Sequence, residues 1–260
     1  MEIPSALLKV LSILETEILT NKKKIILGLT TLALLSVISP FITFFLPVIA
    51  EIYNLSALLP GLEIRPTPGG AVRGAFEELE LWGSIIFGIL IAGTIAGERE
   101  KETFLFLASR PVASKDIILG KAGAWLIVSI LATIIVFIIS TGITFLMWRT
   151  TPIFEVLLAI PTFVMFFLLL ISFAIAMSCL FHSQVASTLT ILISWLSTIY
   201  VIERIPLLQI FTPFYYSQQA LNFIEGITAP TLPLALTYIP LALASVICLV
   251  FSIYLIERGR

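Results

Sequence analysis

Apolar residues occur in long runs along this chain, and short polar segments separate the runs. A helix needs roughly 20 consecutive apolar residues to cross the hydrocarbon core of a bilayer, and six of the runs approach or exceed that length. Backbone polar groups must be satisfied within the bilayer, so such runs form helices. The pattern predicts an all-α polytopic membrane protein with six transmembrane helices, over residues 25–49, 81–96, 122–147, 156–180, 185–202 and 234–256.

The N-terminal residues follow an amphipathic pattern instead. Polar residues such as Lys9 fall on one helical face, and apolar residues recur on another, at Leu7, Leu11, Leu14 and Ile18. We expect residues 1–24 to form a helix in the membrane interface, closed by the lysines at 22–24. A secretory signal peptide is the alternative, but the long apolar run follows the lysines and lacks a small-residue cleavage site.

Two longer segments interrupt the apolar runs on the side opposite the termini. Residues 51–80 are rich in glycine and proline, which predicts an irregular, exposed loop. That loop ends in Glu77, Glu78 and Glu80; a cation site is one interpretation, and acidic residues at a helix N-terminus are the other.

Residues 203–233 form the second of these segments. Within it, Thr212-Pro213 is a helix start signal and Gly226 a stop signal. We expect a short helix between them, in an interfacial or shallow re-entrant position, so that a broken helical segment precedes the last span.

The distribution of basic residues predicts the orientation. The 15 Lys and Arg residues divide 11 to 4 in favour of the side that carries both termini and residues 97–121. Lys and Arg are enriched in cytoplasmic loops. We therefore expect a multi-pass protein of the cell membrane whose termini and charged loop, residues 97–121, are cytoplasmic.

Composition agrees with a membrane protein that has no separate soluble domain. Hydrophobic residues make up 59% of the chain and charged residues 12%, against about 25% charged in a soluble domain. The mean hydropathy is +1.10. Cys179 and Cys248 both lie in apolar runs, so neither suggests a disulfide or a metal site. We expect residues 1–260 to form one transmembrane domain. The lipid bilayer is an expected partner, and no nucleic acid is expected to bind.

Catalytic signatures are absent from the sequence. We expect no ionisable residue at the centre of any predicted span, which disfavours proton-coupled transporters and ion pumps. His182 lies in a predicted turn, and the sequence contains no phosphate-binding loop, serine-hydrolase elbow or zinc-protease motif. We predict no catalytic residue, no metal site and no enzyme activity, so the chain would form a pore or pathway whose energy comes from a partner.

The charged loop is the most specific feature of the sequence. Five consecutive charged residues, 98–102, lie near its start. The loop resembles the one between spans two and three of type-2 ABC transporter permeases, which are the membrane subunits of ATP-binding-cassette exporters. The family pattern is matched at Gly97, Glu98, Arg99, Glu100, Thr103, Leu107, Pro111, Val112, Gly120 and Lys121. The chain departs from it at Glu102, where glycine is common, and at Ala113, where serine is usual.

The resemblance implies a half-transporter. Two permease subunits, identical or related, would assemble with two copies of a separate ATPase subunit, which would bind ATP and Mg while this chain binds no cofactor directly. In that family the loop forms a coupling helix that docks on the ATPase. The residues expected to do so are Glu98, Arg99, Glu100, Lys101, Glu102, Thr103, Phe104, Phe106, Arg110 and Pro111. A solvated charged loop is the alternative interpretation.

The resemblance also places spans two and five along the dimer interface and the translocation path. The small and hydroxyl residues expected there are Gly83, Gly88, Gly93, Ser187, Thr190, Ser194 and Ser197. Small residues are common in helix bundles generally, so ordinary packing is an equal alternative. An ATPase-independent channel or membrane scaffold is the second functional hypothesis. The uncharged path residues favour an amphiphilic or neutral substrate.

Overall fold

The computed structural model describes residues 5–52, 66–101, 113–200, 205, 209, 212–227 and 233–258. Within these residues the chain is helical and contains no strand. The elements are α1 (Ser5–Ile52), α3 (Pro68–Glu78), the π-helical turn η1 (Leu79–Gly83), α4 (Ser84–Ala92), α5 (Ala96–Glu100), α7 (Ser114–Trp148), α8 (Ile153–Leu180), α9 (Gln184–Tyr200), α11 (Pro213–Glu225) and α12 (Pro233–Arg258).

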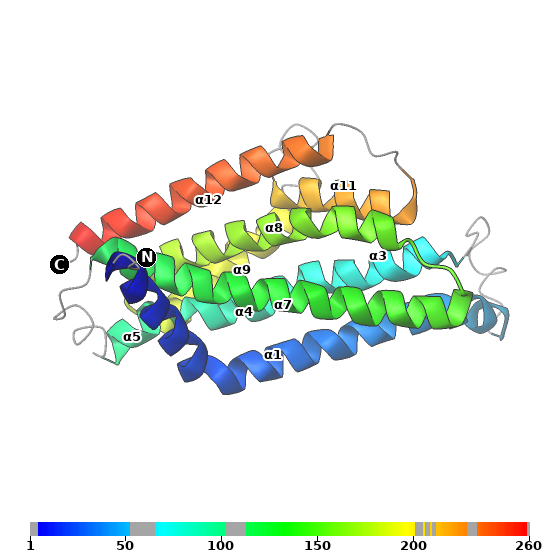
Figure 1. The fold of residues 1–260 in the computed structure, drawn as a ribbon, viewed down its shortest axis with the longest axis horizontal. Coiled ribbons are helices and arrows are strands. Elements are labelled where there is room, and N and C mark those ends of the chain that lie inside the picture. The colour runs from blue at the N-terminus through cyan, green and yellow to red at the C-terminus, as the bar shows by residue number, and fades with distance from the viewer. Residues whose placement is uncertain are drawn as a thin grey trace.

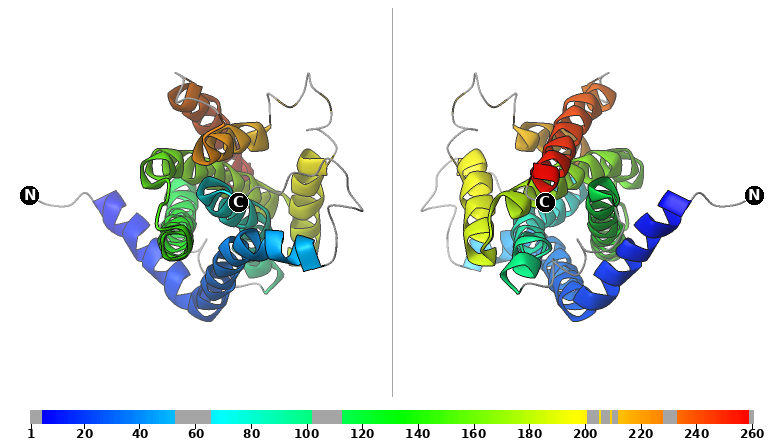
Figure 2. Two further views of the ribbon diagram at one scale, coloured as in Figure 1. Left: turned by 90° about the vertical axis from the view of Figure 1, so that its right-hand side faces the viewer. Right: turned by 90° about the vertical axis from the view of Figure 1, so that its left-hand side faces the viewer.

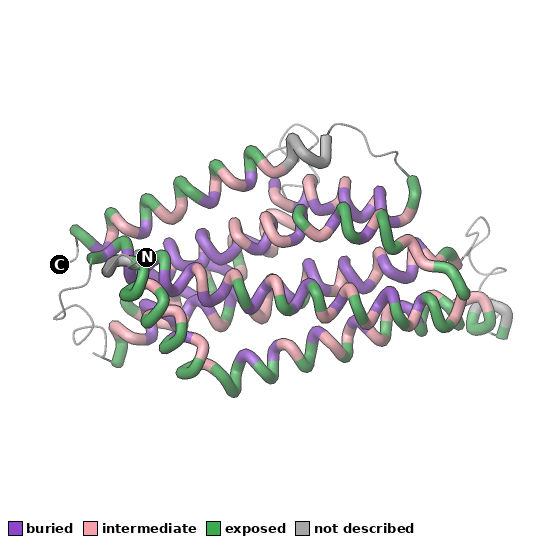
Figure 3. Tube along the Cα trace, in the orientation of Figure 1, coloured by how far each residue is buried: buried purple, intermediate pink, exposed green. Residues whose placement is uncertain are grey.

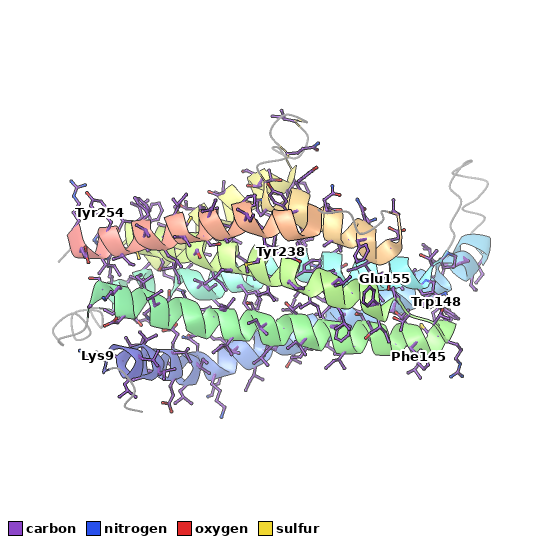
Figure 4. The ribbon with its side chains drawn as sticks, turned by 45° about the horizontal axis from the view of Figure 1, so that its top comes forward. Lys9, Phe145, Trp148, Glu155, Tyr238 and Tyr254 are labelled. Atoms are coloured by element: carbon purple, nitrogen blue, oxygen red, sulfur yellow. The ribbon has the colours of Figure 1, made fainter. Side chains whose placement is uncertain are left out.

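The long helices run side by side along the longest axis of the molecule (Figure 1). Both chain ends and α5 lie at one end of this bundle, and the turn between α7 and α8 lies at the other. The labelled side chains mark the same two ends: Lys9 and Tyr254 lie near the first end, and Trp148 and Glu155 lie near the second (Figure 4). The arrangement puts the described base of the charged loop beside the two termini, as the sequence predicts.

Helix α8 lies at the centre of the bundle. It packs against α4, α7, α9, α11 and α12, while α1, α9 and α12 lie around the outside in the end views (Figure 2). Hydrophobic expulsion does not drive helix association in lipid, so close van der Waals packing has to hold the bundle together. Because α8 lies at the centre, it makes such contacts with these five helices.

Aromatic side chains of α8 form the core of this packing. Phe166 and Phe167 are fully buried, and the Phe166 ring lies 5.5 Å from Trp195 of α9 and 5.2 Å from Phe214 of α11. The Phe167 ring lies 5.3 Å from Phe87 of α4 in an edge-to-face arrangement. Such pairs contribute about 0.5–1.5 kcal/mol each beyond buried area. These two rings of α8 therefore contact rings of three other helices.

Burial is highest on the faces that meet inside the bundle, and the outer faces are exposed (Figure 3). The exposed residues include large apolar side chains such as Ile138 and Leu146, as expected of a surface that faces lipid. Among the described residues, five helices are long and apolar enough to cross a membrane: Leu7–Ile49, Pro68–Glu100, Ser114–Trp148, Ile153–Leu180 and Tyr238–Arg258. The predicted fifth span is a shorter helix of 17 residues, α9.

The expected loop over residues 51–80 is wrong in its second half, which is helical from Pro68 onwards. Thr67 caps this helix by accepting a hydrogen bond from the Gly70 backbone N–H, and Pro68 occupies a first-turn position that tolerates proline. Gly69 is needed for packing, since a Cβ added there would lie 2.9 Å from the Ile224 carbonyl oxygen at the end of α11. The glycines that predicted a loop permit a close helix contact.

Two other predicted boundaries also change. Helix α1 is continuous from Ser5 to Ile52, so no break separates residues 1–24 from the first span; the first part of α1 instead turns away from the rest (Figures 1 and 2). Helix α7 begins at Ser114, before the predicted start of the third span at residue 122, so the last part of the expected loop is helical; Asp116 and Lys121 are buried there.

The predicted short helix in the second long segment is confirmed as α11. Thr212 caps its start by accepting from the Tyr215 backbone N–H, and Gly226 ends it with a positive φ of 80°. Most of the rest of residues 203–233 lies outside the described residues. The position of α11 relative to a membrane stays a prediction.

Candidate functional site

The described base of the charged loop begins at a break in a helix. Helix α4 ends at Ala92 and α5 begins at Ala96. The Ser178 hydroxyl of α8 spans the break: it accepts hydrogen bonds from the Ile95 and Ala96 backbone N–H groups, at 3.1 and 2.9 Å. It also donates to the Ala92 carbonyl at 2.8 Å. A single buried hydroxyl thus replaces the helical hydrogen bonds that the break removes.

The loop ends at Lys121, which is buried. Its ammonium nitrogen Nζ lies 2.7 Å from Glu98 Oε1, 2.8 Å from Glu17 Oε2 and 2.9 Å from the Thr94 carbonyl oxygen. The Lys121 side chain is only 2% exposed and that of Glu17 only 7%. A buried ammonium group requires such partners, because its three donors lose water when it is buried.

Neighbouring residues complete this cluster. The Asn21 side chain donates to Glu17 Oε1 at 3.0 Å, so both Glu17 oxygens accept a hydrogen bond. Gly120 allows α1 to approach α7 here, since a Cβ added to it would lie 2.8 Å from the Ile13 Cβ. The cluster of Glu17, Glu98 and Lys121 therefore ties the N-terminal part of α1 to α5 and α7.

Two charged residues of α5 bind the turn between α8 and α9. Arg99 donates to the Cys179 carbonyl at the end of α8, at 2.6 Å. Glu100 accepts from the Gln184 backbone N–H at the start of α9, at 2.9 Å. A cation at a helix C-terminus and an anion at a helix N-terminus each have a favourable interaction with the helix dipole. Helix α5 thereby supplies a capping group to both helices.

The residues predicted to dock on an ATPase therefore fall into three groups. Glu98, Arg99 and Glu100 have side-chain contacts within this chain, and Lys101 is exposed at the end of α5. The remaining six lie outside the described residues: Glu102, Thr103, Phe104, Phe106, Arg110 and Pro111. Docking through any of them stays a prediction.

The predicted path and dimer-interface glycines face helices of the same chain. A Cβ added to Gly83 would lie 3.0 Å from the Phe167 ring, one added to Gly88 3.2 Å from Ile191, and one added to Gly93 3.0 Å from the Gln184 side chain. These glycines let α4 and its flanking turns approach α8 and α9 closely. The packing alternative accounts for these contacts, and a role in a path stays a prediction.

The hydroxyl residues of α9 bond largely to their own helix. Thr190 donates to the Ala186 carbonyl at 2.8 Å, and Ser197 donates to the Ile193 carbonyl at 2.6 Å. Thr188 and Thr198 make the equivalent bonds. Ser187 is fully buried and Ser194 partly buried. Such bonds satisfy a hydroxyl within a membrane helix without any partner helix.

Glu80 is a buried acidic residue whose position the sequence analysis missed. It lies in the π-helical turn η1, is 4% exposed, and accepts a hydrogen bond from the Ser217 hydroxyl of α11 at 2.5 Å. The Ser84 hydroxyl donates to the Glu80 carbonyl. The predicted second span, residues 81–96, has no ionisable residue, but Glu80 directly precedes it and lies buried within the longer Pro68–Glu100 helix. The sequence signal for this burial is the position of Glu80 between two apolar residues, Leu79 and Leu81.

A second charged network lies near the start of α3. Arg73 donates to Glu77 at 2.7 Å and, from α3 across to α11, to Glu225 at 2.5 Å and Asn222 at 3.1 Å. Glu77, one of the acidic residues considered for a cation site, is thus paired with an arginine. Among the described residues, no group of three or more His, Cys, Asp or Glu side chains could hold a metal ion.

The site therefore consists of a helix break, a buried lysine with two carboxylates, and a short helix that caps two others. These groups join the segment around α5 to α1, α7, α8 and α9 through hydrogen bonds and ion pairs. No protein-family model matches this chain, and no curated protein matches it.

Proposed function

We propose that this chain is the membrane-spanning permease subunit of an ATP-binding-cassette exporter, which forms the translocation path and couples it to a separate ATPase subunit. The proposal rests first on the resemblance of residues 97–121 to the coupling loop of type-2 permeases. It rests second on the all-helical fold with several membrane-capable helices.

The observation that carries the proposal is the attachment of the loop base to four helices. Glu98 and Lys121 join α5 and α7 to Glu17 of α1. Ser178 and Arg99 attach the same segment to α8, and Glu100 attaches it to α9. A displacement of the loop would therefore act on four helices together, which suits a segment through which a partner drives a conformational change.

The assembly that we propose contains two copies of this chain, or this chain and a relative, with two ATPase subunits. ATP and Mg would be bound by the ATPase, and this chain would have no catalytic residue of its own. Six spans, counting α9, would place both termini and the charged loop in the cytoplasm of a cell-membrane protein. Helices α4 and α9, with their flanking turns, would face the path.

Co-purification from the organism that makes the protein tests this proposal. We expect an ATPase subunit to accompany the tagged full-length chain in roughly equal amount, in mild detergent. Replacing Phe104 and Phe106 by alanine should remove the ATPase, because buried aromatic anchors dominate interfaces of this kind. Replacing Tyr215 and Tyr216 of α11 by alanine is the matched control, since it removes two aromatic rings from another part of the chain.

The outcomes separate the two functional hypotheses. Loss of the ATPase from the loop variant alone supports the exporter. Recovery of the wild-type chain by itself, with passive ion conductance of the purified oligomer in liposomes, would overturn it in favour of an ATPase-independent channel. Retention of the ATPase by both variants would refute docking through the two phenylalanines.

A further inference from the structure

A polar cavity lies beside the loop base. It has a volume of about 580 Å³ and is bounded by the N-terminal part of α1, the break between α4 and α5, and the start of α9. Sites for small ligands typically measure about 300–1,000 Å³. The cavity is therefore large enough for a polar headgroup.

The charges around the cavity favour an anion. Three lysines and two glutamates line it, which gives a formal charge of +3 − 2 = +1. Both glutamates, Glu17 and Glu98, pair with Lys121. Lys24 and Lys101 line the same cavity from α1 and from the end of α5 and are exposed, and within the described residues neither has an ion-pair partner. Two ammonium groups are thus available to an incoming anion.

The position of the cavity along α1 indicates where that anion comes from. Lys24 is the last residue of the basic run 22–24, and the apolar part of α1 begins directly after it. Ile26 and Leu27, in the next turn, are 54% and 69% exposed, as residues that contact acyl chains would be. A basic segment next to an apolar helix lies at the depth of lipid headgroups and attracts anionic lipids.

We propose that this cavity binds the phosphate headgroup of an anionic phospholipid, held between Lys24 of α1 and Lys101, which directly follows α5. The hydroxyls of Ser12 and Thr20 also line the cavity and can serve as additional donors. A bound headgroup joins α1 to the end of α5 and so supplements the Glu17–Lys121–Glu98 cluster. Lys101 is also among the residues expected to dock on the ATPase, so the site is tested on this chain alone, where lipid binding and ATPase binding can be measured separately.

Native mass spectrometry of the full-length protein in detergent tests this site, with phosphatidylglycerol, phosphatidylcholine and soluble glycerol phosphate as probes. We expect the protein to bind phosphatidylglycerol in preference to phosphatidylcholine. The double variant K24Q/K101Q should weaken phosphatidylglycerol binding about 30-fold. Each lysine near an anionic lipid surface contributes a similar amount to the binding free energy, and the figure is the sum of two such contributions. The double variant K22Q/K23Q is the matched control, because Lys22 and Lys23 are exposed on the same helix but do not line the cavity.

Three results would overturn the proposal. Equal weakening by both double variants would show diffuse attraction to the basic run rather than a site. Equal affinity for phosphatidylcholine would remove the role of net negative charge. Equal affinity for glycerol phosphate would assign the cavity to a soluble phosphate compound rather than to a lipid. All four substituted lysines are exposed, so both variants are expected to fold, which their thermal unfolding midpoints would check.

Discussion

Lys121 of α7 and Glu98 of α5 form an ion pair with 2.7 Å between Nζ and Oε1, across 23 residues of sequence. These two residues lie at the two ends of the charged loop, so the loop closes on itself at its base. The same ammonium group binds Glu17 of α1. The polar segment that divides the apolar runs in the sequence is thus anchored in the protein interior at both of its ends.

Replacing Lys121 by methionine should destabilise the protein by about 3–5 kcal/mol, because the buried Glu17 and the partly buried Glu98 would lose the cation between them. Thermal or denaturant unfolding of the purified protein in detergent would measure this change. Lys115→Met is the control, since Lys115 is exposed on the same helix. Adding Glu17→Gln and Glu98→Gln to Lys121→Met should recover part of the loss; similar stability of the Lys115 and Lys121 variants would contradict the role of the cluster.

Replacing Ser178 by alanine should cost about 1–3 kcal/mol, because the Ile95 and Ala96 backbone N–H groups would lose their common acceptor in a buried place. Ser172→Ala provides the comparison. Ser172 is equally buried on α8 but donates only to the Leu168 carbonyl of its own helix, so its loss should change stability little. If the two alanine variants unfold at the same temperature, Ser178 does not hold the helix break.

Glu80 and Ser217 should show energetic coupling in a double-mutant cycle. We expect an interaction of about 0.5–3 kcal/mol between Glu80→Leu and Ser217→Ala, since the two side chains share one hydrogen bond. Glu80→Gln keeps an acceptor oxygen and should be milder than Glu80→Leu. Glu78→Leu with Ser217→Ala is the control cycle, which should be additive within about 0.5 kcal/mol; equal coupling in the two cycles would exclude a specific link between η1 and α11.

Gly69→Ala should destabilise the junction of α3 with α11 by about 1–3 kcal/mol, because the new methyl group meets backbone atoms that cannot rotate away. Gly142→Ala is a matched control. Gly142 lies in α7 with no atom within 4 Å of an added Cβ, and alanine is favoured over glycine in a helix by up to about 1 kcal/mol. The two substitutions should therefore shift the unfolding midpoint in opposite directions; a stabilising Gly69→Ala would contradict the close contact.

Local signals in the sequence predict some of these elements correctly and mislead at others. Thr212-Pro213 and Gly226 predict α11 because capping depends on neighbouring residues. Thr67-Pro68 is the same start signal, but the glycines after it favoured a loop, and their packing role depends on Ile224, far along the chain. Periodicity and composition thus predict the helical class and several helix ends, but not contacts between distant segments.

The candidate site shows the same limit. Glu98, Arg99 and Glu100 stand out in the sequence through the resemblance to the permease loop, but their partners in α7, α8 and α9 do not. Lys121 belongs to a polar stretch in the sequence, and nothing near it indicates burial, because its partner Glu17 lies 104 residues away. A buried ion pair of this separation leaves no local pattern, and Ser178 looks like any other serine in an apolar helix.

The hydrogen-bonding pattern of α9 limits what its surface can recognise. Each hydroxyl has one hydrogen to donate and two lone pairs. Four of these residues already donate their hydrogen to a carbonyl one turn earlier in the same helix: Thr188, Thr190, Ser197 and Thr198. What remains at these positions is a set of acceptors. A molecule or neighbouring helix that meets them must supply the hydrogens, so amines, amides and alcohols are favoured there over ethers, esters and carboxylates.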